Sequence, residues 1–263
     1  MTILLVGGDS WTDPNLVKDN WAEQLVNETD MLLINKAKVG YGNQAIFETL
    51  IEEIQKHKGK IKQLIVCWSA SDRYDIEVYN NYLMYHGYSF KDENTPAETI
   101  VPCYAPNVSN MYNVLDKQFT DVDNMLEVFI NKTLRYAWLL EQICDKEGIP
   151  IIQFNGIDYI FESKHYKLYG KKLDKNIKNK VVDIIKKSKY KIKTYLGLDT
   201  VWCWDEELRK LEKDEDISRY RVGYNRSSNW YMWNTGKLNF DWHPNKLGHT
   251  VIKDIIKNKI SYK

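Results

Sequence analysis

The stretch ILLVGGDS at residues 3–10 begins with four apolar residues, continues with two glycines and ends with an aspartate and a serine. Its apolar part predicts a strand buried on both faces. The same alternation continues, with expected helices at 16–26 and 43–57 and expected strands at 31–34 and 64–68. Strands separated by helices predict right-handed crossovers, and therefore an α/β protein with helices on both faces of a parallel sheet.

The rest of the chain contains one irregular stretch and several further elements. Residues 75–118 are rich in tyrosine and break the pattern, which indicates an insertion between core elements. We also expect a helix at 120–146, a strand at 149–154, a lysine-rich helix within 171–193, a tryptophan-rich segment at 200–242 and an amphipathic helix at 245–260. No repeat or flexible linker interrupts this order, so residues 1–263 are predicted to form a single domain.

The charge of the chain argues against several classes of function. Its 263 residues carry 37 Lys and Arg against 36 Asp and Glu, for a net charge of +1. Such a balance gives no overall attraction for nucleic acid or an anionic membrane, and a solvated face is the better interpretation of the lysine-rich helix. No stretch is long and apolar enough to span a membrane, and the N-terminal residues lack the features of a signal peptide. We therefore expect a soluble protein made in the cytoplasm.

The cysteine and histidine patterns predict neither a metal nor a cofactor. The four cysteines are widely spaced, and the five histidines form no ligand motif. Cys67 lies within an apolar run, which favours a buried free thiol. The sequence also contains no glycine-rich nucleotide motif.

Two segments at opposite ends of the chain carry residues suited to acyl transfer. Ser10 follows the first strand, at the sheet edge where parallel α/β proteins bind ligands. Taken alone, Asp9 and Ser10 are better explained as a turn or a helix cap. However, Asp241 and His243 stand just before the last helix. A serine, an imidazole and a carboxylate together supply a nucleophile, a base and an orienting acid, which favours catalysis.

These segments resemble the SGNH/GDSL hydrolase family. Its first block, Gly-Asp-Ser after strand one, matches residues 8–10. Its last block matches His243 to His249, where Pro-Asn and Gly-His follow the first histidine. Its second block is similar to residues 37–43, with the family glycine at Gly40. The resemblance implies a three-layer α/β/α sandwich with a parallel, flavodoxin-like sheet, and hydrolysis of a carboxylic ester.

The resemblance also implies a role for each residue. Ser10 is the nucleophile, His243 the general base and Asp241 the acid that orients the base. The backbone N–H groups of Ser10 and Gly40 hold the oxyanion. His249, six residues after the expected base, is predicted to be structural.

The third block of the family is altered in this sequence. Ser71 stands where the family has an asparagine that donates to the oxyanion. Asn43, Ser69 or Ser71 could supply the missing donor, and the sequence does not choose among them. Residues 68–73, Trp-Ser-x-x-x-Arg, resemble a variant branch of the family that occurs in phage and viral proteins.

Two functions from different classes remain open. The first is an ester hydrolase that acts on a small-molecule ester or an acyl ester of a carbohydrate, because Trp11 and Trp242 adjoin the serine and the histidine and indole faces suit sugar rings. The alternative is a weakly active or inactive protein of the same fold, a structural or glycan-binding part of a virus particle. The missing asparagine favours the second function, and the joint presence of Ser10 and His243 favours the first.

Overall fold

The computed structural model describes the central sheet and most of the helices that cover it. The described residues are 1–38, 41–71, 75–78, 81–84, 122–156, 167–168, 171–172, 177–198, 203, 210, 221–223 and 240–260. Only the backbone is described at 75–78, 81–84, 122–126, 167–168, 171–172, 177–178, 221–223, 240–242 and 259–260.

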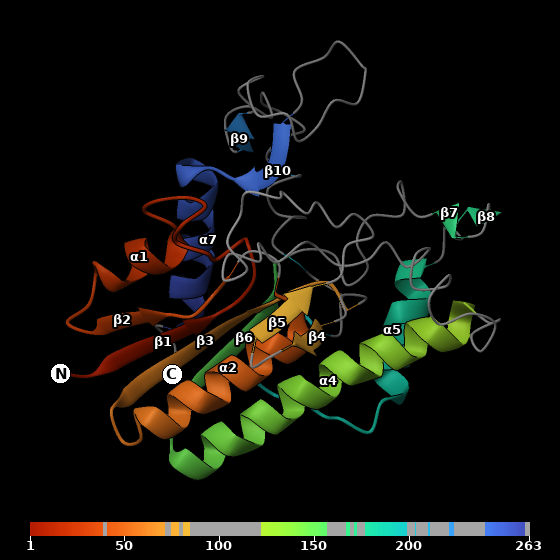
Figure 1. The fold of residues 1–263 in the computed structure, drawn as a ribbon, viewed down its shortest axis with the longest axis horizontal. Helices are drawn as coiled ribbons and strands as arrows, with labels where there is room; N and C mark the ends of the chain where they lie inside the picture. The colour runs from red at the N-terminus through yellow and green to blue at the C-terminus, as the bar shows by residue number, and fades with distance from the viewer. Residues whose placement is uncertain are drawn as a thin grey trace.

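A parallel sheet forms the centre of the fold (Figure 1). Its strands are ordered β2-β1-β3-β6, and every neighbouring pair is parallel. Their bounds are Ile3–Gly7 for β1, Leu32–Asn35 for β2, Ile61–Trp68 for β3 and Ile151–Asn155 for β6. This is the order of a flavodoxin-like sheet, in which ligands bind beyond the carboxyl ends of β1 and β3. The predicted sheet is therefore confirmed.

Helices cover both faces of the sheet, as predicted. One face carries α2 (Asn43–Lys56), α4 (Val122–Glu147) and α5 (Ile177–Lys187), and the other carries α1 (Trp21–Val26) and α7 (Lys246–Ile260). Alternate residues of β1 contribute to the two layers: Leu5 packs in the cluster with α2 and α4, and Leu4 packs in the cluster with α1 and α7. The arrangement is a three-layer α/β/α sandwich.

Short antiparallel strand pairs lie outside the central sheet. They are β4 (Asp75–Val78) with β5 (Asn81–Met84), β7 (Lys167–Leu168) with β8 (Lys171–Lys172), and β9 (Arg221–Gly223) with β10 (Phe240–Pro244). The predicted insertion thus starts with a hairpin, while residues 85–118 and most of the tryptophan-rich segment lie outside the described residues. Among the described helices, none has the length and apolar composition needed to cross a bilayer. Cys67 is buried and takes part in no disulfide, as predicted.

Two helices are shorter than the sequence predicted. The first begins at Trp21 rather than residue 16, because Asn20 caps it. The Asn20 side chain accepts hydrogen bonds from the backbone of Ala22 and Glu23, and the Glu23 side chain accepts one from the backbone of Asn20. This reciprocal capping box fixes the start of a helix. The lysine-rich helix is confined to Ile177–Lys187, because Lys171 and Lys172 form β8.

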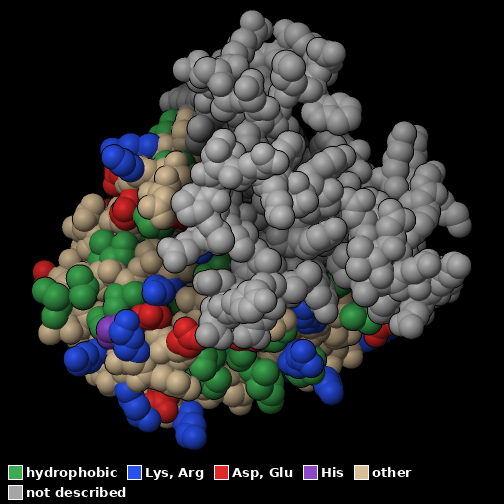
Figure 2. Space-filling view, in the orientation of Figure 1, with side chains coloured by type: hydrophobic (Ala, Val, Ile, Leu, Met, Phe, Trp, Pro, Cys, Tyr) green, Lys and Arg blue, Asp and Glu red, His purple; other side chains and the backbone are tan. Residues whose placement is uncertain are grey.

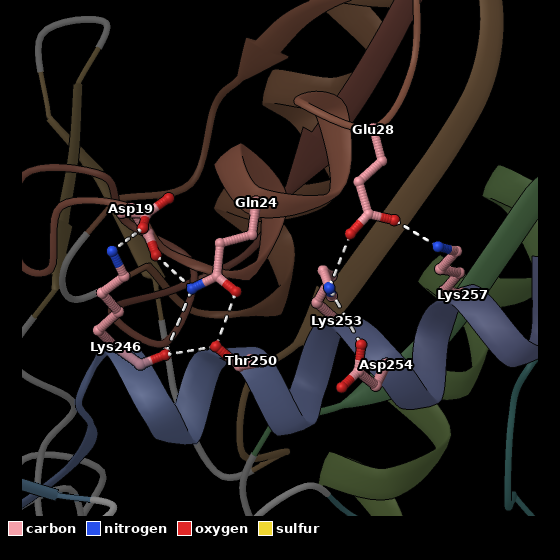
Figure 3. A network of polar contacts seen from close by, with 8 residues as sticks. All are labelled: Asp19, Gln24, Glu28, Lys246, Thr250, Lys253, Asp254 and Lys257. Atoms are coloured by element: carbon pink, nitrogen blue, oxygen red, sulfur yellow. Dashed lines mark hydrogen bonds and ion pairs between the residues drawn. The ribbon is translucent and has the colours of Figure 1, made fainter.

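The packing of α7 on α1 includes a polar network (Figure 3). Gln24 Nε2 donates to the backbone oxygens of Asp19 at 2.6 Å and Lys246 at 3.3 Å. Gln24 Oε1 accepts a hydrogen bond from Thr250 Oγ1 at 2.9 Å. The first turns of α7 are therefore held against α1 through the backbone of α7 at Lys246 and through its Thr250 side chain.

The same network continues along α7 at Glu28. Its carboxylate accepts hydrogen bonds from Lys253 at 2.8 Å and from Lys257 at 2.5 Å. These two hydrogen bonds are the main reason why the pKa of Glu28 is lowered from 4.5 to about 2. The ionised carboxylate thus stabilises the docked helix.

We predict that Glu28→Gln lowers the midpoint of thermal unfolding at pH 7 by no more than a few degrees, since the network is exposed to solvent. Because the folded pKa lies below 4.5, the contribution of Glu28 is complete above that pH and is lost as the pH falls towards 2. Melting followed by circular dichroism should show the difference between variant and wild type disappearing over this interval. Glu52→Gln, at an exposed position of α2, is the matched control and should leave the midpoint unchanged. A difference that persisted at pH 2 would contradict this account.

Candidate functional site

Ser10 lies in a tight turn directly after β1. The turn is closed by a hydrogen bond from the Thr12 backbone N–H to the Asp9 carbonyl, at 3.0 Å. Gly8 allows the turn to pack closely: a Cβ at this position would lie 2.7 Å from Thr12 Oγ1 and 3.2 Å from Cys67 Cβ. The Ser10 side chain is consequently held at the carboxyl edge of the sheet, where 3% of the residue is exposed.

His243 reaches this turn from the other end of the chain. Its Nε2 lies 2.7 Å from Ser10 Oγ, within hydrogen-bonding distance. His243 belongs to β10 and is followed by Pro244 and Asn245. Asn245 caps α7 by accepting a hydrogen bond from the Gly248 backbone N–H at 3.0 Å. The position of the imidazole is thus set by the start of α7, which is itself docked on α1.

Trp11 lies beside this pair of residues. Its ring centroid is 6.2 Å from that of His243, with the two planes tilted by 46°. Trp11 is also a buried member of the core cluster under α1 and α7. The predicted position of Trp11 near the imidazole is therefore observed, although most of its surface packs in the core.

Asp9 joins the turn to the loop after β3. Its Oδ1 accepts a hydrogen bond from the Trp11 backbone N–H at 3.0 Å, and its Oδ2 accepts one from Ser69 Oγ at 2.6 Å. Asp9 and Ser69 are both fully buried. Charge-assisted hydrogen bonds of this kind are stronger than neutral ones, so Asp9 holds Ser10 at a set distance from the β3 loop. The hydroxyl of Ser69 is used in this contact.

Asn43 fastens the same loop to α2 and α4. Its Oδ1 accepts a hydrogen bond from the Ser69 backbone N–H at 2.8 Å. Its Nδ2 donates to the Ser69 carbonyl and to Thr133 Oγ1, each at 3.0 Å. Both amide hydrogens are thereby occupied, so in this structure Asn43 holds the loop rather than presenting a donor to a substrate.

Ser71 differs from the other two donors considered for the oxyanion. It is buried, with 2% of its surface exposed, and its hydroxyl has no hydrogen-bond partner among the described residues. An unpaired buried hydroxyl costs stability. It is therefore available for a hydrogen bond with a group that is not part of the described chain.

His249 lies in the first turns of α7 and is buried, with 2% exposed. Burial, together with the nearby His243, lowers its pKa to about 3. His249 is thus neutral at ordinary pH. This agrees with a structural role.

Three predicted site residues lie wholly or partly outside the described residues. Gly40 lies outside the described residues, and for Asp241 and Trp242 only the backbone in β10 is described. Among the described residues, no group of three or more His, Cys, Asp or Glu side chains could hold a metal ion.

Asn155, a polar residue at the end of β6, was not predicted from the sequence as part of the site. Asn155 is fully buried, its Oδ1 accepts a hydrogen bond from the Tyr195 hydroxyl, and its Nδ2 has no partner among the described residues. Asn155 pairs with Trp68 in the neighbouring strand, so it lies next to the loop that contains Ser69 and Ser71. A polar residue at the carboxyl end of a buried strand was the signal that could have identified it.

No family model and no curated protein matches this chain. Three solved structures resemble it over nearly their whole length, with low scores. The psychrotrophic esterase EstA from Pseudoalteromonas sp. has a TM-score of 0.42 at 10% identity and covers 99% of this chain and 97% of its own. The acetyl xylan esterase AlAXEase has a TM-score of 0.44 at 10% identity, and the match covers 98% of this chain and 99% of the esterase. TesA has a TM-score of 0.40 at 11% identity, and the match covers 98% of this chain and 97% of TesA. Similarity at this level says nothing about the activity of this chain, which has to follow from the geometry of the site.

We predict that Asn43→Ala destabilises the protein by about 2–4 kcal/mol, because it leaves buried backbone groups of the β3 loop and Thr133 without their partner. Urea denaturation followed by tryptophan fluorescence measures this difference. Gln44→Ala is the control, since Gln44 is the next residue of α2 and makes part-buried side-chain contacts with Glu48 and Tyr136. Equal losses for the two variants would rule out the role given to Asn43.

Proposed function

We propose that this protein is a serine-dependent hydrolase of carboxylic esters, with Ser10 as nucleophile and His243 as general base. The observation that carries the proposal is the 2.7 Å contact between Ser10 Oγ and His243 Nε2. These residues stand 233 positions apart in the chain and meet at the sheet edge where parallel α/β proteins bind ligands. A nucleophile within hydrogen-bonding reach of a base is the geometry that acyl transfer requires.

The reaction follows from this pair. His243 Nε2 takes the proton of the Ser10 hydroxyl as Oγ attacks the ester carbonyl, and a tetrahedral oxyanion forms. The oxyanion collapses to an acyl-serine as His243 gives that proton to the departing alcohol. A water molecule, deprotonated by His243, then attacks the acyl-serine, and the carboxylic acid leaves as Ser10 regains its proton.

We further propose that Asp241 orients the imidazole and favours its protonated form. The support is its position in β10, two residues before His243. An acid that holds the imidazole in the required tautomer contributes strongly to catalysis in serine hydrolases.

Three donors are proposed for the oxyanion: the backbone N–H groups of Ser10 and Gly40, and the hydroxyl of Ser71. Ser71 is chosen by elimination, because Ser69 Oγ donates to Asp9 and the amide of Asn43 is occupied by the loop and Thr133. Only Ser71, of the three side chains considered, keeps a buried and unpartnered donor among the described residues. Preorganised donors at a developing negative charge are among the largest contributions to catalysis.

The substrate proposed is a small-molecule ester or an acyl ester on a carbohydrate. The indole proposed to meet the substrate is Trp242, next to His243 in sequence. Trp11 is buried and is proposed to form the wall of the site behind the imidazole, against which it packs. Aromatic faces suit both apolar acyl groups and the apolar faces of sugar rings.

Ser10→Ala and His243→Ala are each expected to lower kcat for a chromogenic acetyl ester by about a thousandfold or more, because the two groups act as a unit. A fluorophosphonate probe should label the wild type and fail to label Ser10→Ala. Ser188→Ala, which removes a buried serine outside the site, is the control and should be labelled normally. A well-folded wild type that neither reacts with the probe nor hydrolyses esters would instead indicate the inactive structural or glycan-binding protein.

For Ser71→Ala we expect a fall in kcat of the order of a hundredfold with little change in KM, because the donor acts on the oxyanion of the transition state. The free energy of unfolding should not decrease, since the hydroxyl has no partner to lose among the described residues. Ser71→Cys keeps a weaker donor of similar size and should give an intermediate rate. An unchanged kcat in Ser71→Ala, measured beside its urea denaturation curve, would remove Ser71 from the proposed oxyanion site.

A further inference from the structure

A hollow of about 580 Å³ lies between α4 and the end of α5, outside the Ser10 site. Both helices and the turn after α5 line it. The lining residues are Glu127, Val128, Asn131, Lys132 and Arg135 from α4, with Ile184, Lys187, Ser188, Lys189 and Tyr190 from α5 and that turn. We call this feature the α4/α5 groove. Its size is within the range that holds a ligand of a few rings.

The charge of the groove is strongly positive, unlike that of the chain as a whole. Its lining includes four cationic side chains and one carboxylate, whereas the chain carries a net charge of +1. Arg135, Lys187 and Lys189 are exposed, and none of them forms an ion pair within the described part of the chain. In Figure 2, Lys and Arg side chains lie among hydrophobic ones along the lower edge of the described surface, where Figure 1 places α4. Arg135 and Lys189 have tyrosine rings rather than carboxylates as their described neighbours. Cations without a nearby carboxylate at a concave surface attract an anionic ligand.

The groove also offers apolar and hydrogen-bonding surface between its charges. Val128 is 52% exposed, an unusual degree for an apolar side chain in a hollow. The half-buried Tyr190 ring packs against Trp138, with centroids 5.9 Å apart, and Lys189 Nζ lies over the same ring, 5.3 Å from its centroid. Asn131 Oδ1 accepts a hydrogen bond from Ser188 Oγ at 2.9 Å, which leaves the Asn131 amide hydrogens for other partners. An aromatic face, an amide and several cations are together the groups that recognise ring faces, hydroxyls and carboxylates.

We propose that the α4/α5 groove binds an acidic carbohydrate chain whose sugars carry carboxylate groups. The cations, including Lys189 over the Tyr190 ring, would pair with the carboxylates, the exposed Val128 would contact the ring faces, and Asn131 would bond sugar hydroxyls. Nucleic acid fits less well, because the chain has no overall positive charge and Tyr190 is the single aromatic side chain among the described residues of the lining.

The groove and the candidate active site share α4. Thr133, whose hydroxyl accepts a hydrogen bond from Asn43, follows Asn131 and Lys132 directly in that helix. A carbohydrate held in the groove would therefore lie against the helix that supports the β3 loop. The binding itself does not depend on the chemistry proposed at Ser10.

The test uses the full chain carrying Ser10→Ala, so that binding is measured without hydrolysis. Calorimetric titration at low salt with an oligogalacturonate is expected to show binding that weakens as salt is added. Its methyl ester, which has the same sugars without the charge, should bind at least about tenfold more weakly, a loss of about 1.4 kcal/mol. The double variant Arg135→Gln/Lys187→Gln should weaken oligogalacturonate binding by at least about the same factor.

Lys60→Gln/Lys62→Gln provides the matched control, because it removes two exposed charges elsewhere on the surface. It should bind oligogalacturonate as the parent does, and melting curves should confirm that both double variants are folded. Absence of binding, equal binding of the methyl ester, or equal effects of the two double variants would each overturn the proposal. Tighter binding of a single-stranded oligonucleotide or of polyglutamate than of oligogalacturonate would overturn it as well. Ester hydrolysis with Ser10 intact, measured separately on a small soluble substrate, keeps failure of the groove distinct from failure of the proposed catalysis.

Discussion

The carboxylate of Asp9 is the contact on which the geometry of the candidate site depends. It is fully buried between the turn after β1 and the loop after β3, and it accepts hydrogen bonds from the Trp11 backbone and Ser69 Oγ. A buried charge is tolerated only when it is well bonded, so neither partner can move without a large cost. Since Ser10 lies between Asp9 and Trp11 in the chain, the same bonds that satisfy the carboxylate also position the hydroxyl. Asn43 extends this framework to α2 and, through Thr133, to α4.

His243 depends on a separate part of the structure. It stands just before α7, and α7 is placed by its apolar packing under α1 and by the polar network around Gln24 and Glu28. The contact between Ser10 and His243 therefore joins two segments that are held by different hydrogen bonds but share one apolar cluster, which contains Trp11 and residues of α7. A loss of α7 docking would separate the base from the serine and would also remove apolar partners of that cluster. In this sense the helix packing on one face of the sheet is a requirement for the proposed chemistry at its edge.

Local pattern was sufficient to predict the strands of the central sheet and the helices on both of its faces, because buried strands and the order of elements leave few topologies to choose from. The pairing of Ser10 with His243 was expected from the chemistry of the two segments and their resemblance to a hydrolase family rather than from topology. Local pattern was not sufficient for the first helix, where Asn20 and Glu23 form a capping box that starts the helix five residues later than its apolar spacing indicated. It was also insufficient for Asn43, whose partners Ser69 and Thr133 are distant in sequence. The α4/α5 groove likewise combines residues from two helices, and a lysine-rich segment alone indicated only a solvated face.

The distribution of unpaired groups separates the framework of the site from the surface that would meet a ligand. The side chains that join its elements, Asp9 and Asn43, are hydrogen-bonded through their polar atoms. By contrast, three buried polar atoms have no partner among the described residues: Ser71 Oγ and Asn155 Nδ2, which lie at the ends of the adjacent strands β3 and β6, and His249 Nδ1 in α7. Each such group costs about 1–3 kcal/mol relative to a bonded one. Unpaired donors at the carboxyl edge of the sheet lower the stability of the protein. An ester oxygen bound at this edge would supply the missing hydrogen-bond acceptor.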